Sequence, residues 1–138
     1  MRTYSHCDRR CALGVLLAGG LLVASRVAAD EPDFVDLATA RAEHEAGRAV
    51  LIDIREPEEH ASGVALGARL LPMRQMNARM SEIPNDPRRP VLLICATQNR
   101  SSAIARALRQ RGFTNVRYVQ GGMSEWGRRG WPLVPPAR

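Results

Sequence analysis

Residues 91–102 read VLLICATQNRSS, and this stretch decides both the fold and the position of the chemistry. The apolar run Val91–Ile94 is typical of a buried strand, and the amphipathic pattern over Ala103–Arg111, closed by Gly112, is typical of a helix. Cys95 is therefore expected at the carboxyl end of a strand, facing the start of a helix. Free backbone N–H groups and the positive end of the helix dipole meet at such a point, so it favours an anion and stabilises a thiolate.

Taken alone, Cys95 allows two interpretations. Free cysteine is one of the most buried residue types, so a structural thiol at a strand end is common. The alternative is a reactive thiolate in the field of the helix. Arg100, at the mouth of the helix, adds a permanent positive charge that favours the second interpretation.

The N-terminal segment has the three parts of a secretory signal peptide. Basic residues Arg2, Arg9 and Arg10 precede the apolar stretch Cys11–Ala24, and small residues lead to a cleavage point after Ala29. The apolar stretch is shorter than the roughly 20 residues that span a bilayer, so we expect no stable membrane anchor. Twin-arginine export is a weaker alternative to general secretion, because the residues around the arginine pair fit its motif poorly.

Cleavage at this point predicts that residues 1–29 are a signal peptide and that residues 30–138 are one mature domain, periplasmic or secreted. Cys7 and Cys11 leave with the leader, so Cys95 is the one cysteine of the exported protein. An internal disulfide and a CxxC dithiol are both excluded. The remaining interpretations are an inert buried thiol and a thiol that performs single-sulfur chemistry.

The charge pattern excludes one class of partner. Residues 30–138 have 16 arginines and 13 acidic residues, a net charge of +3, and the arginines are scattered among the acidic residues. Nucleic-acid binding requires a basic stripe with aromatic side chains for stacking, so we expect no nucleic-acid partner. A mild positive balance suits a small anionic substrate.

Strands and helices alternate along the rest of the chain, which predicts an α/β, doubly wound domain. Apolar runs without alternation favour a parallel sheet covered on both faces. Sites in such sheets lie at the carboxyl ends of strands, where Asp53 and Cys95 both fall. Further strands are expected over 33–35, 49–54, 68–71 and 116–119, and helices over 37–46, 57–61 and 73–83.

Several spaced segments together resemble one family, the rhodanese domains, which are sulfurtransferases. The segments are Asp53–His60, Gly67–Pro72, Cys95–Ser101 and Leu108–Trp126. The resemblance covers nearly all of the mature chain, and it implies a three-layer α/β/α rhodanese-like fold with a central, mainly parallel five-stranded sheet. The small size and the leader resemble the single-domain periplasmic members.

The resemblance implies a persulfide mechanism without a metal ion or cofactor. The Cys95 thiolate would take a sulfur atom from thiosulfate or a similar small anionic donor and pass it to cyanide or a thiol acceptor. Backbone N–H groups of the loop would stabilise the anionic persulfide. The loop residues that bind substrate or persulfide would be Ala96, Thr97, Gln98, Asn99, Arg100 and Ser101.

Three side chains in or next to the loop have two interpretations each, and a fourth departs from the family's usual residue. Arg100 holds the donor anion or braces the loop. The hydroxyls of Ser101 and Ser102 donate to the sulfur or cap the following helix. The family often has glycine at the position of Gln98, and glycine there permits a positive φ that other residues rarely adopt.

Asp53 and Arg55 are expected to support the site. Arg55 is interpreted as the partner of Glu59 or Glu58 in an ion pair rather than as a guide for the anion. Asp53 is interpreted as an acceptor that fixes a loop. His60 is expected to pack in the structure rather than to act as a base.

Loop length separates this chain from relatives that act on phosphate or arsenate, in which the cysteine and the arginine are separated by five residues. Here the longer spacing reaches Ser101 instead of an arginine, so a phosphatase or arsenate reductase is not expected. A persulfide carrier that gives its sulfur to a docked protein remains an alternative to an enzyme with free-standing turnover. An inactive rhodanese fold used for interaction is disfavoured by the presence of Cys95.

Overall fold

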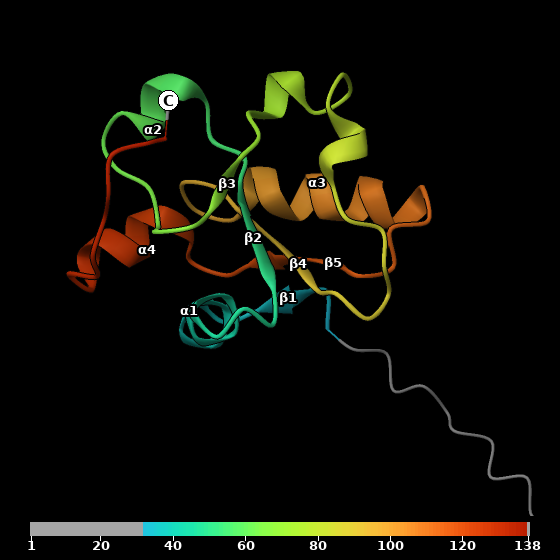
Figure 1. The fold of residues 1–138 in the computed structure, drawn as a ribbon, viewed down its shortest axis with the longest axis horizontal. Helices are drawn as coiled ribbons and strands as arrows, with labels where there is room; N and C mark the ends of the chain where they lie inside the picture. Colours follow the sequence, from blue (N-terminus) through green and yellow to red (C-terminus); the bar gives the residue numbers. More distant parts are fainter. Residues whose placement is uncertain (1–31, 138) are drawn as a thin grey trace, which may run out of the picture.

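Five parallel strands form the centre of this computed structural model, which describes residues 32–137 (Figure 1). The order across the sheet is β1-β5-β4-β2-β3, and every neighbouring pair is parallel. The predicted α/β fold with a five-stranded sheet is confirmed. The predicted signal peptide, residues 1–29, lies outside the described residues. The strands are β1 (Phe34–Val35), β2 (Val50–Asp53), β3 (Arg69–Leu70), β4 (Val91–Ile94) and β5 (Val116–Val119).

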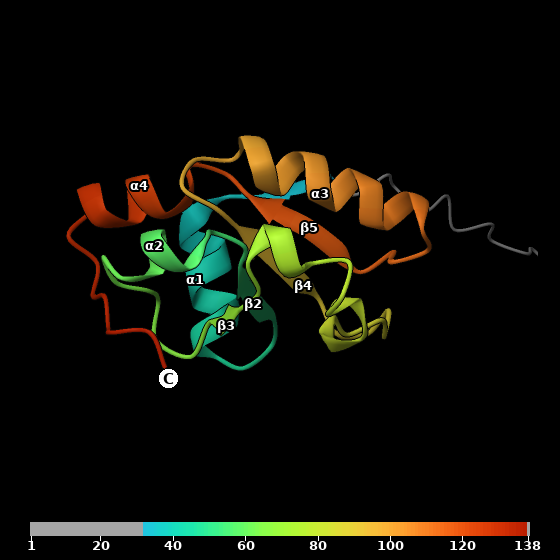
Figure 2. The same ribbon diagram turned by 90° about the horizontal axis from the view of Figure 1, so that it is seen from above.

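Helices cover both faces of the sheet (Figure 2). One face packs against α3 and the segment that contains Met76 and Ile83, and the other packs against α1 and α4. None of the helices within residues 32–137 is long and apolar enough to cross a membrane. The helices are α1 (Leu37–Glu45), α2 (Pro57–His60), α3 (Asn99–Gln110) and α4 (Gly122–Arg128), with short 3-10 turns η1 (Met73–Gln75) and η2 (Met80–Glu82).

The two central strands explain the unbroken apolar runs of the sequence. Every residue of β2 and of β4 is buried. Val91 and Leu93 point to the α3 face, whereas Leu92 and Ile94 point to the face covered by α1 and α4. Since side chains alternate between faces, a strand buried on both sides must be apolar throughout.

The predicted helix over 73–83 is wrong, because this segment forms the two 3-10 turns η1 and η2 instead. A segment this short relies on tertiary packing for its helicity. Met76 and Ile83 are buried against the sheet without a continuous helix. The Arg79 guanidinium donates to the Leu70 carbonyl at 3.3 Å and so ties the segment to the end of β3.

Two differences at helix starts concern the site. α3 begins at Asn99, four residues before the predicted start at Ala103, and this places Arg100 and Ser101 in its first turn. The sequence analysis predicted no helix after β5, where α4 begins at Gly122. The remaining helices and strands agree with the prediction to within a residue or two at each end.

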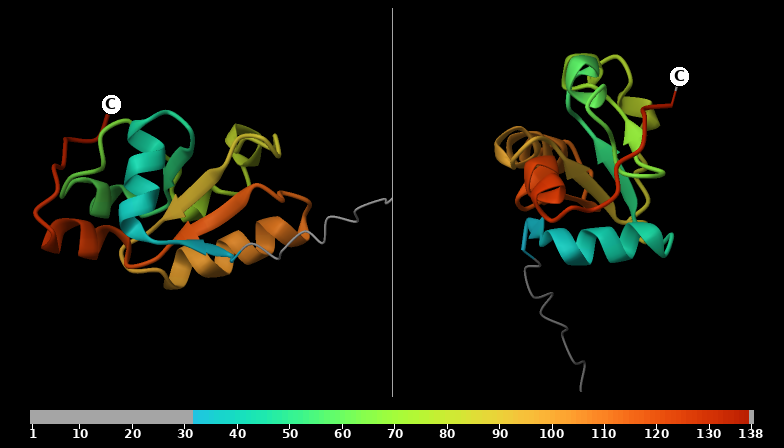
Figure 3. Two further views of the ribbon diagram at one scale, coloured as in Figure 1. Left: turned by 90° about the horizontal axis from the view of Figure 1, so that it is seen from below. Right: turned by 90° about the vertical axis from the view of Figure 1, so that its left-hand side faces the viewer.

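The last described residues return to the segment that follows α2 (Figure 3). Val64 and Val134 pair in antiparallel fashion through two backbone hydrogen bonds of 2.9 Å. The Trp126 indole N–H donates to the Pro132 carbonyl at 3.1 Å. This C-terminal stretch therefore holds the loop after α2 in place beside the site.

We expect Leu93→Ala to lower the free energy of unfolding by about 3 kcal/mol, because Leu93 lies in β4 with 0% of its surface exposed and its truncation leaves a cavity. Urea denaturation measures the change. Leu66→Ala is the matched control, since Leu66 is 74% exposed and its truncation should change stability by less than about 0.5 kcal/mol. Equal losses in the two variants would contradict the assignment of β4 to the centre of the core.

Candidate active site

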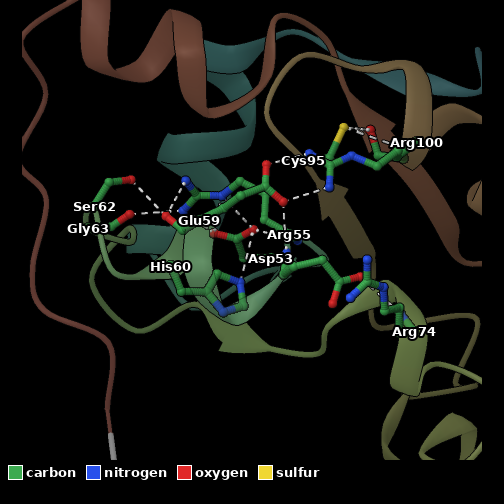
Figure 4. A network of polar contacts seen from close by, with 11 residues as sticks. Asp53, Arg55, Glu59, His60, Ser62, Gly63, Arg74, Cys95 and Arg100 are labelled. Carbon is green, nitrogen blue, oxygen red and sulfur yellow. Dashed lines mark hydrogen bonds and ion pairs between the residues drawn. The ribbon is translucent and has the colours of Figure 1, made fainter.

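Cys95 follows β4 directly, and its sulfur faces the first turn of α3 (Figure 4). The Sγ atom lies 3.4 Å from the backbone nitrogen of Ser101 and 3.4 Å from its hydroxyl oxygen. Cys95 is 1% exposed and Ser101 is fully buried. The predicted order of strand, thiol and helix is confirmed, and the helix start supplies a backbone N–H to the sulfur.

The serine hydroxyls do not cap α3, so that expectation is wrong. The residue at the cap position is Gln98. The Ser101 hydroxyl donates to the Gln98 carbonyl at 3.2 Å, and the Ser102 hydroxyl donates to the Asn99 carbonyl at 3.0 Å. The Ser101 hydroxyl oxygen also contacts the sulfur, but as the acceptor of a hydrogen bond from the Cys95 thiol at 3.4 Å and not as a donor.

Gln98 occupies the position where the family often has glycine. Its φ is −153°, which lies outside the positive range that favours glycine. The substitution therefore places no side chain in the left-handed region. The Cys95 loop, residues 95–101, accommodates glutamine here because its path does not require a positive φ.

Arg100 is held by a carboxylate from a different element. Its two terminal nitrogens donate to the two oxygens of Glu59, on α2, at 2.6 and 2.7 Å. These hydrogen bonds lower the pKa of Glu59 to about 2, and the same contact raises the pKa of Arg100. Of the two interpretations of Arg100, the geometry favours the brace, because its fork is already bound to a carboxylate.

Glu59 was missed as a partner of the Cys95 loop. It is the third residue of α2, where its carboxylate accepts the Glu56 N–H at 2.9 Å in a capping box. A glutamate three residues after a cap position was a visible signal for this local role. The long-range contact with Arg100 depends on tertiary structure, and no local pattern in the sequence reports it.

The partner of Arg55 differs from the prediction. Arg55 binds Asp53 rather than Glu58 or Glu59, with a shortest nitrogen–oxygen distance of 2.7 Å. Asp53 is 0% exposed and Arg55 is 5% exposed. A buried carboxylate without a countercharge would be very costly, so Asp53 takes the nearest guanidinium. Remaining Arg55 N–H groups donate to the backbone carbonyls of Gly63 at 2.9 Å and Glu59 at 3.3 Å.

Asp53 fixes the segment after β2, as expected. Besides the Arg55 side chain, its carboxylate accepts the Arg55 backbone N–H at 3.1 Å. His60 is buried beside it, with Nε2 3.5 Å from a carboxylate oxygen, a distance too long for a good hydrogen bond. His60 therefore packs beside Asp53, and its Nε2 atom has no hydrogen-bond partner within residues 32–137.

The structure thus brings the predicted residues together in two connected groups (Figure 4). One is the Cys95 loop, with its sulfur on α3. The other is the buried pair of Asp53 and Arg55, which anchors the chain around α2. Glu59 joins the two groups through Arg100. Residues 32–137 contain no cluster of His, Cys, Asp and Glu side chains that could hold a metal ion.

The site thus consists of a buried thiol at a helix start, with a backbone N–H and a hydroxyl oxygen on its sulfur. This fold and site are those of a known class, and the chain belongs to the rhodanese-like domain family. The family's model, described as "Rhodanese-like domain", matches residues 36–129.

Two relatives and one solved structure show the extent of the similarity. A protein named "Sulfurtransferase" from Allochromatium vinosum is 41% identical over 87 residues, which cover 63% of this chain and 79% of that protein. A Bacillus subtilis protein, "Uncharacterized protein YqhL", is 42% identical over 80 residues, which cover 58% of this chain and 62% of that protein. The crystal structure of a rhodanese-related protein from Thermoplasma volcanium shares the fold with a TM-score of 0.63 at 24% identity, covering 74% of this chain and 97% of that one.

We expect the Arg100–Glu59 pair to make stability depend on pH. The pKa of Glu59 in the folded protein, about 2, lies below its ordinary value of 4.5. The contribution of the pair is therefore complete above about pH 4.5 and is lost as the pH falls toward 2. Because about a third of each side chain is exposed to solvent, we expect Glu59→Gln to cost only about 1 to 2 kcal/mol at pH 7.

Urea denaturation of Glu59→Gln and wild type between pH 7 and pH 3 measures this effect. The difference between the two proteins should shrink as the pH falls. Glu45→Gln is the control, because Glu45 pairs with Arg41 on the exposed face of α1 and should cost less than about 0.5 kcal/mol. A difference that stays constant down to pH 3 would show that the Glu59 carboxylate does not carry the effect.

Proposed function

We propose that this protein is a sulfurtransferase that accepts a sulfane sulfur from thiosulfate or a similar anionic donor, carries it as a Cys95 persulfide, and transfers it to cyanide or a thiol. The main support is the placement of the Cys95 sulfur 3.4 Å from the Ser101 N–H at the start of α3. Membership of the rhodanese-like family and the named sulfurtransferase relative agree with it.

The proposed sulfur transfer needs no metal and no redox cofactor, because each step forms one bond to sulfur and breaks another. The Cys95 thiolate attacks the outer sulfur of thiosulfate, the sulfur–sulfur bond to the enzyme forms, and the bond within the donor breaks. The electron pair of that broken bond leaves with sulfite. Cyanide or a thiolate then attacks the outer sulfur of the persulfide, and the Cys95 thiolate returns.

The burial of Cys95 is compatible with sulfur transfer, because the atom that is transferred is the outer sulfur of the persulfide and not Sγ itself. The second sulfur of a persulfide lies about 2 Å beyond Sγ, so it extends the reactive atom away from the buried position. Its negative charge needs donors at that point. The Ser101 N–H donates to Sγ, with 3.4 Å between nitrogen and sulfur, and a loop of backbone N–H groups is a known form of anion site.

The same burial supports one alternative, a persulfide carrier for a protein acceptor. With 1% of its surface exposed, Cys95 offers little access to a large thiol in solution. In a carrier, a docked partner would open that access and remove the sulfur. The two functions share the loading step and differ in whether small acceptors support turnover.

We expect thiosulfate treatment to add the mass of one sulfur atom to the wild-type protein and nothing to Cys95→Ser. Intact-mass spectrometry measures the gain, and far-UV circular dichroism confirms that the variant is folded. Equal gains in both proteins would remove Cys95 from the mechanism. Continuous formation of thiocyanate from thiosulfate and cyanide supports the enzyme, whereas one equivalent of loading without turnover supports the carrier.

We also propose that the chain is exported to the periplasm or secreted, on the support of the tripartite N-terminal sequence. Expression of the full chain in a bacterium with a periplasm should yield a periplasmic protein whose N-terminus is Asp30. N-terminal sequencing of each cell fraction tests this. A protein that keeps residues 1–29 and stays in the cytosol would contradict the proposal.

A further inference from the structure

Three consecutive carbonyl groups of the Cys95 loop converge on a single glycine at the start of α4. A Cβ atom placed on Gly122 would lie 2.5 Å from the Cys95 carbonyl oxygen, 2.6 Å from that of Ala96, and closer still to that of Thr97. Gly122 also has a φ of +62°, which favours glycine. Both observations require that position to carry no side chain.

The first turn of α4 binds these carbonyls. The Met123 N–H donates to the Cys95 carbonyl and the Ser124 N–H donates to the Ala96 carbonyl, both at 2.8 Å. The free N–H groups of a helix start thus find their acceptors in the loop that carries the thiol. The close approach that Gly122 allows makes these two hydrogen bonds possible.

Peptide geometry carries this contact to the other side of the loop. The described peptide bonds are all trans, and in a trans peptide the N–H points opposite to the carbonyl. The carbonyls of Cys95, Ala96 and Thr97 are directed at α4, so the N–H group that follows each of them points away from α4. These N–H groups belong to Ala96, Thr97 and Gln98, and they lie on the face of the loop opposite α4.

Gln98 links the two helices on either side of the loop. Its side-chain oxygen accepts the N–H of Gly121, the cap residue of α4, at 3.1 Å. Its own carbonyl accepts the Ser102 N–H at 2.8 Å at the start of α3. A glycine at this position would leave the Gly121 N–H without that acceptor.

We propose that Gly122 and Gln98 are positioning residues for sulfur transfer, an inference that rests on the proposed function. By holding the carbonyl side of the Cys95 loop, α4 presents the N–H side to the sulfur and to the persulfide that forms on it. A peptide that turned over would direct a carbonyl oxygen at the anion instead. Neither residue touches the reacting atoms, and both act through the orientation of residues 95–98.

The test compares Gly122→Ala with Gly130→Ala. Both glycines have a positive φ, +62° and +65°, so both variants place an alanine at a φ that favours glycine. A Cβ on Gly130 meets no atom within 4 Å, whereas a Cβ on Gly122 meets the loop carbonyls. We expect Gly122→Ala to slow both iodoacetamide alkylation of Cys95 and persulfide loading from thiosulfate by about 100-fold, the scale of losing one preorganised donor. Gly130→Ala should stay within about twofold of wild type in both rates.

A second pair of variants tests the proposal even if Gly122→Ala fails to fold. Gln98→Met preserves the length of the side chain and removes the acceptor for the Gly121 N–H. We expect it to slow both reactions by about three- to tenfold, the scale of one hydrogen bond. Gln110→Met, at the exposed far end of α3, is the control and should react as wild type does.

The two readouts separate this inference from the proposed function. Slower alkylation in Gln98→Met, with a circular dichroism spectrum and a melting temperature matching those of Gln110→Met, supports the positioning role, and slower alkylation in Gly122→Ala with the circular dichroism spectrum of a folded protein agrees with it. Wild-type alkylation rates in both variants would overturn it. If alkylation slows in the variants but thiosulfate adds no sulfur to the wild type, Gly122 and Gln98 position the Cys95 thiol, and the proposed transfer of sulfur from thiosulfate is wrong.

Discussion

The register between β2 and β4 is the constraint on which the rest of the structure depends. In this register Asp53 lies opposite Ile94, so the two strands end together at one edge of the sheet. The chain that leaves β2 leads to Arg55 and α2, and the chain that leaves β4 begins with Cys95. A slip of one residue would turn the apolar side chains of a strand to the opposite face and separate these groups. Packing on both faces of β4 therefore fixes the position of the sulfur.

Three helices then meet the Cys95 loop, each with a different kind of contact. α3 brings a backbone N–H and a buried hydroxyl to the sulfur. α2 brings the Glu59 carboxylate to the Arg100 guanidinium. α4 brings backbone donors to the carbonyls behind the thiol. These contacts from neighbouring elements help to hold the loop in one arrangement, which the proposed function requires of a site for an anion.

Local patterns in the sequence were sufficient for the strands, for the position of Cys95 and for the family. They failed where tertiary contacts decide. The segment 73–83 has helical spacing but forms two 3-10 turns, because burial of Met76 and Ile83 does not need a continuous helix. Arg55 has acidic residues at helical spacing but binds Asp53, whose complete burial makes it the stronger competitor. The sequence analysis also could not show that Glu59 meets Arg100, 41 residues further along the chain.

The pairing of Arg100 with Glu59 has a consequence for the anionic donor that we propose. From neutral pH down to about pH 4.5 both partners stay ionised, so the pair contributes no net charge beside the Cys95 loop. The attraction for such a donor would then come from amide dipoles, which neither gain nor lose protons. A site built in this way would select among anions by shape and hydrogen bonding more than by total charge.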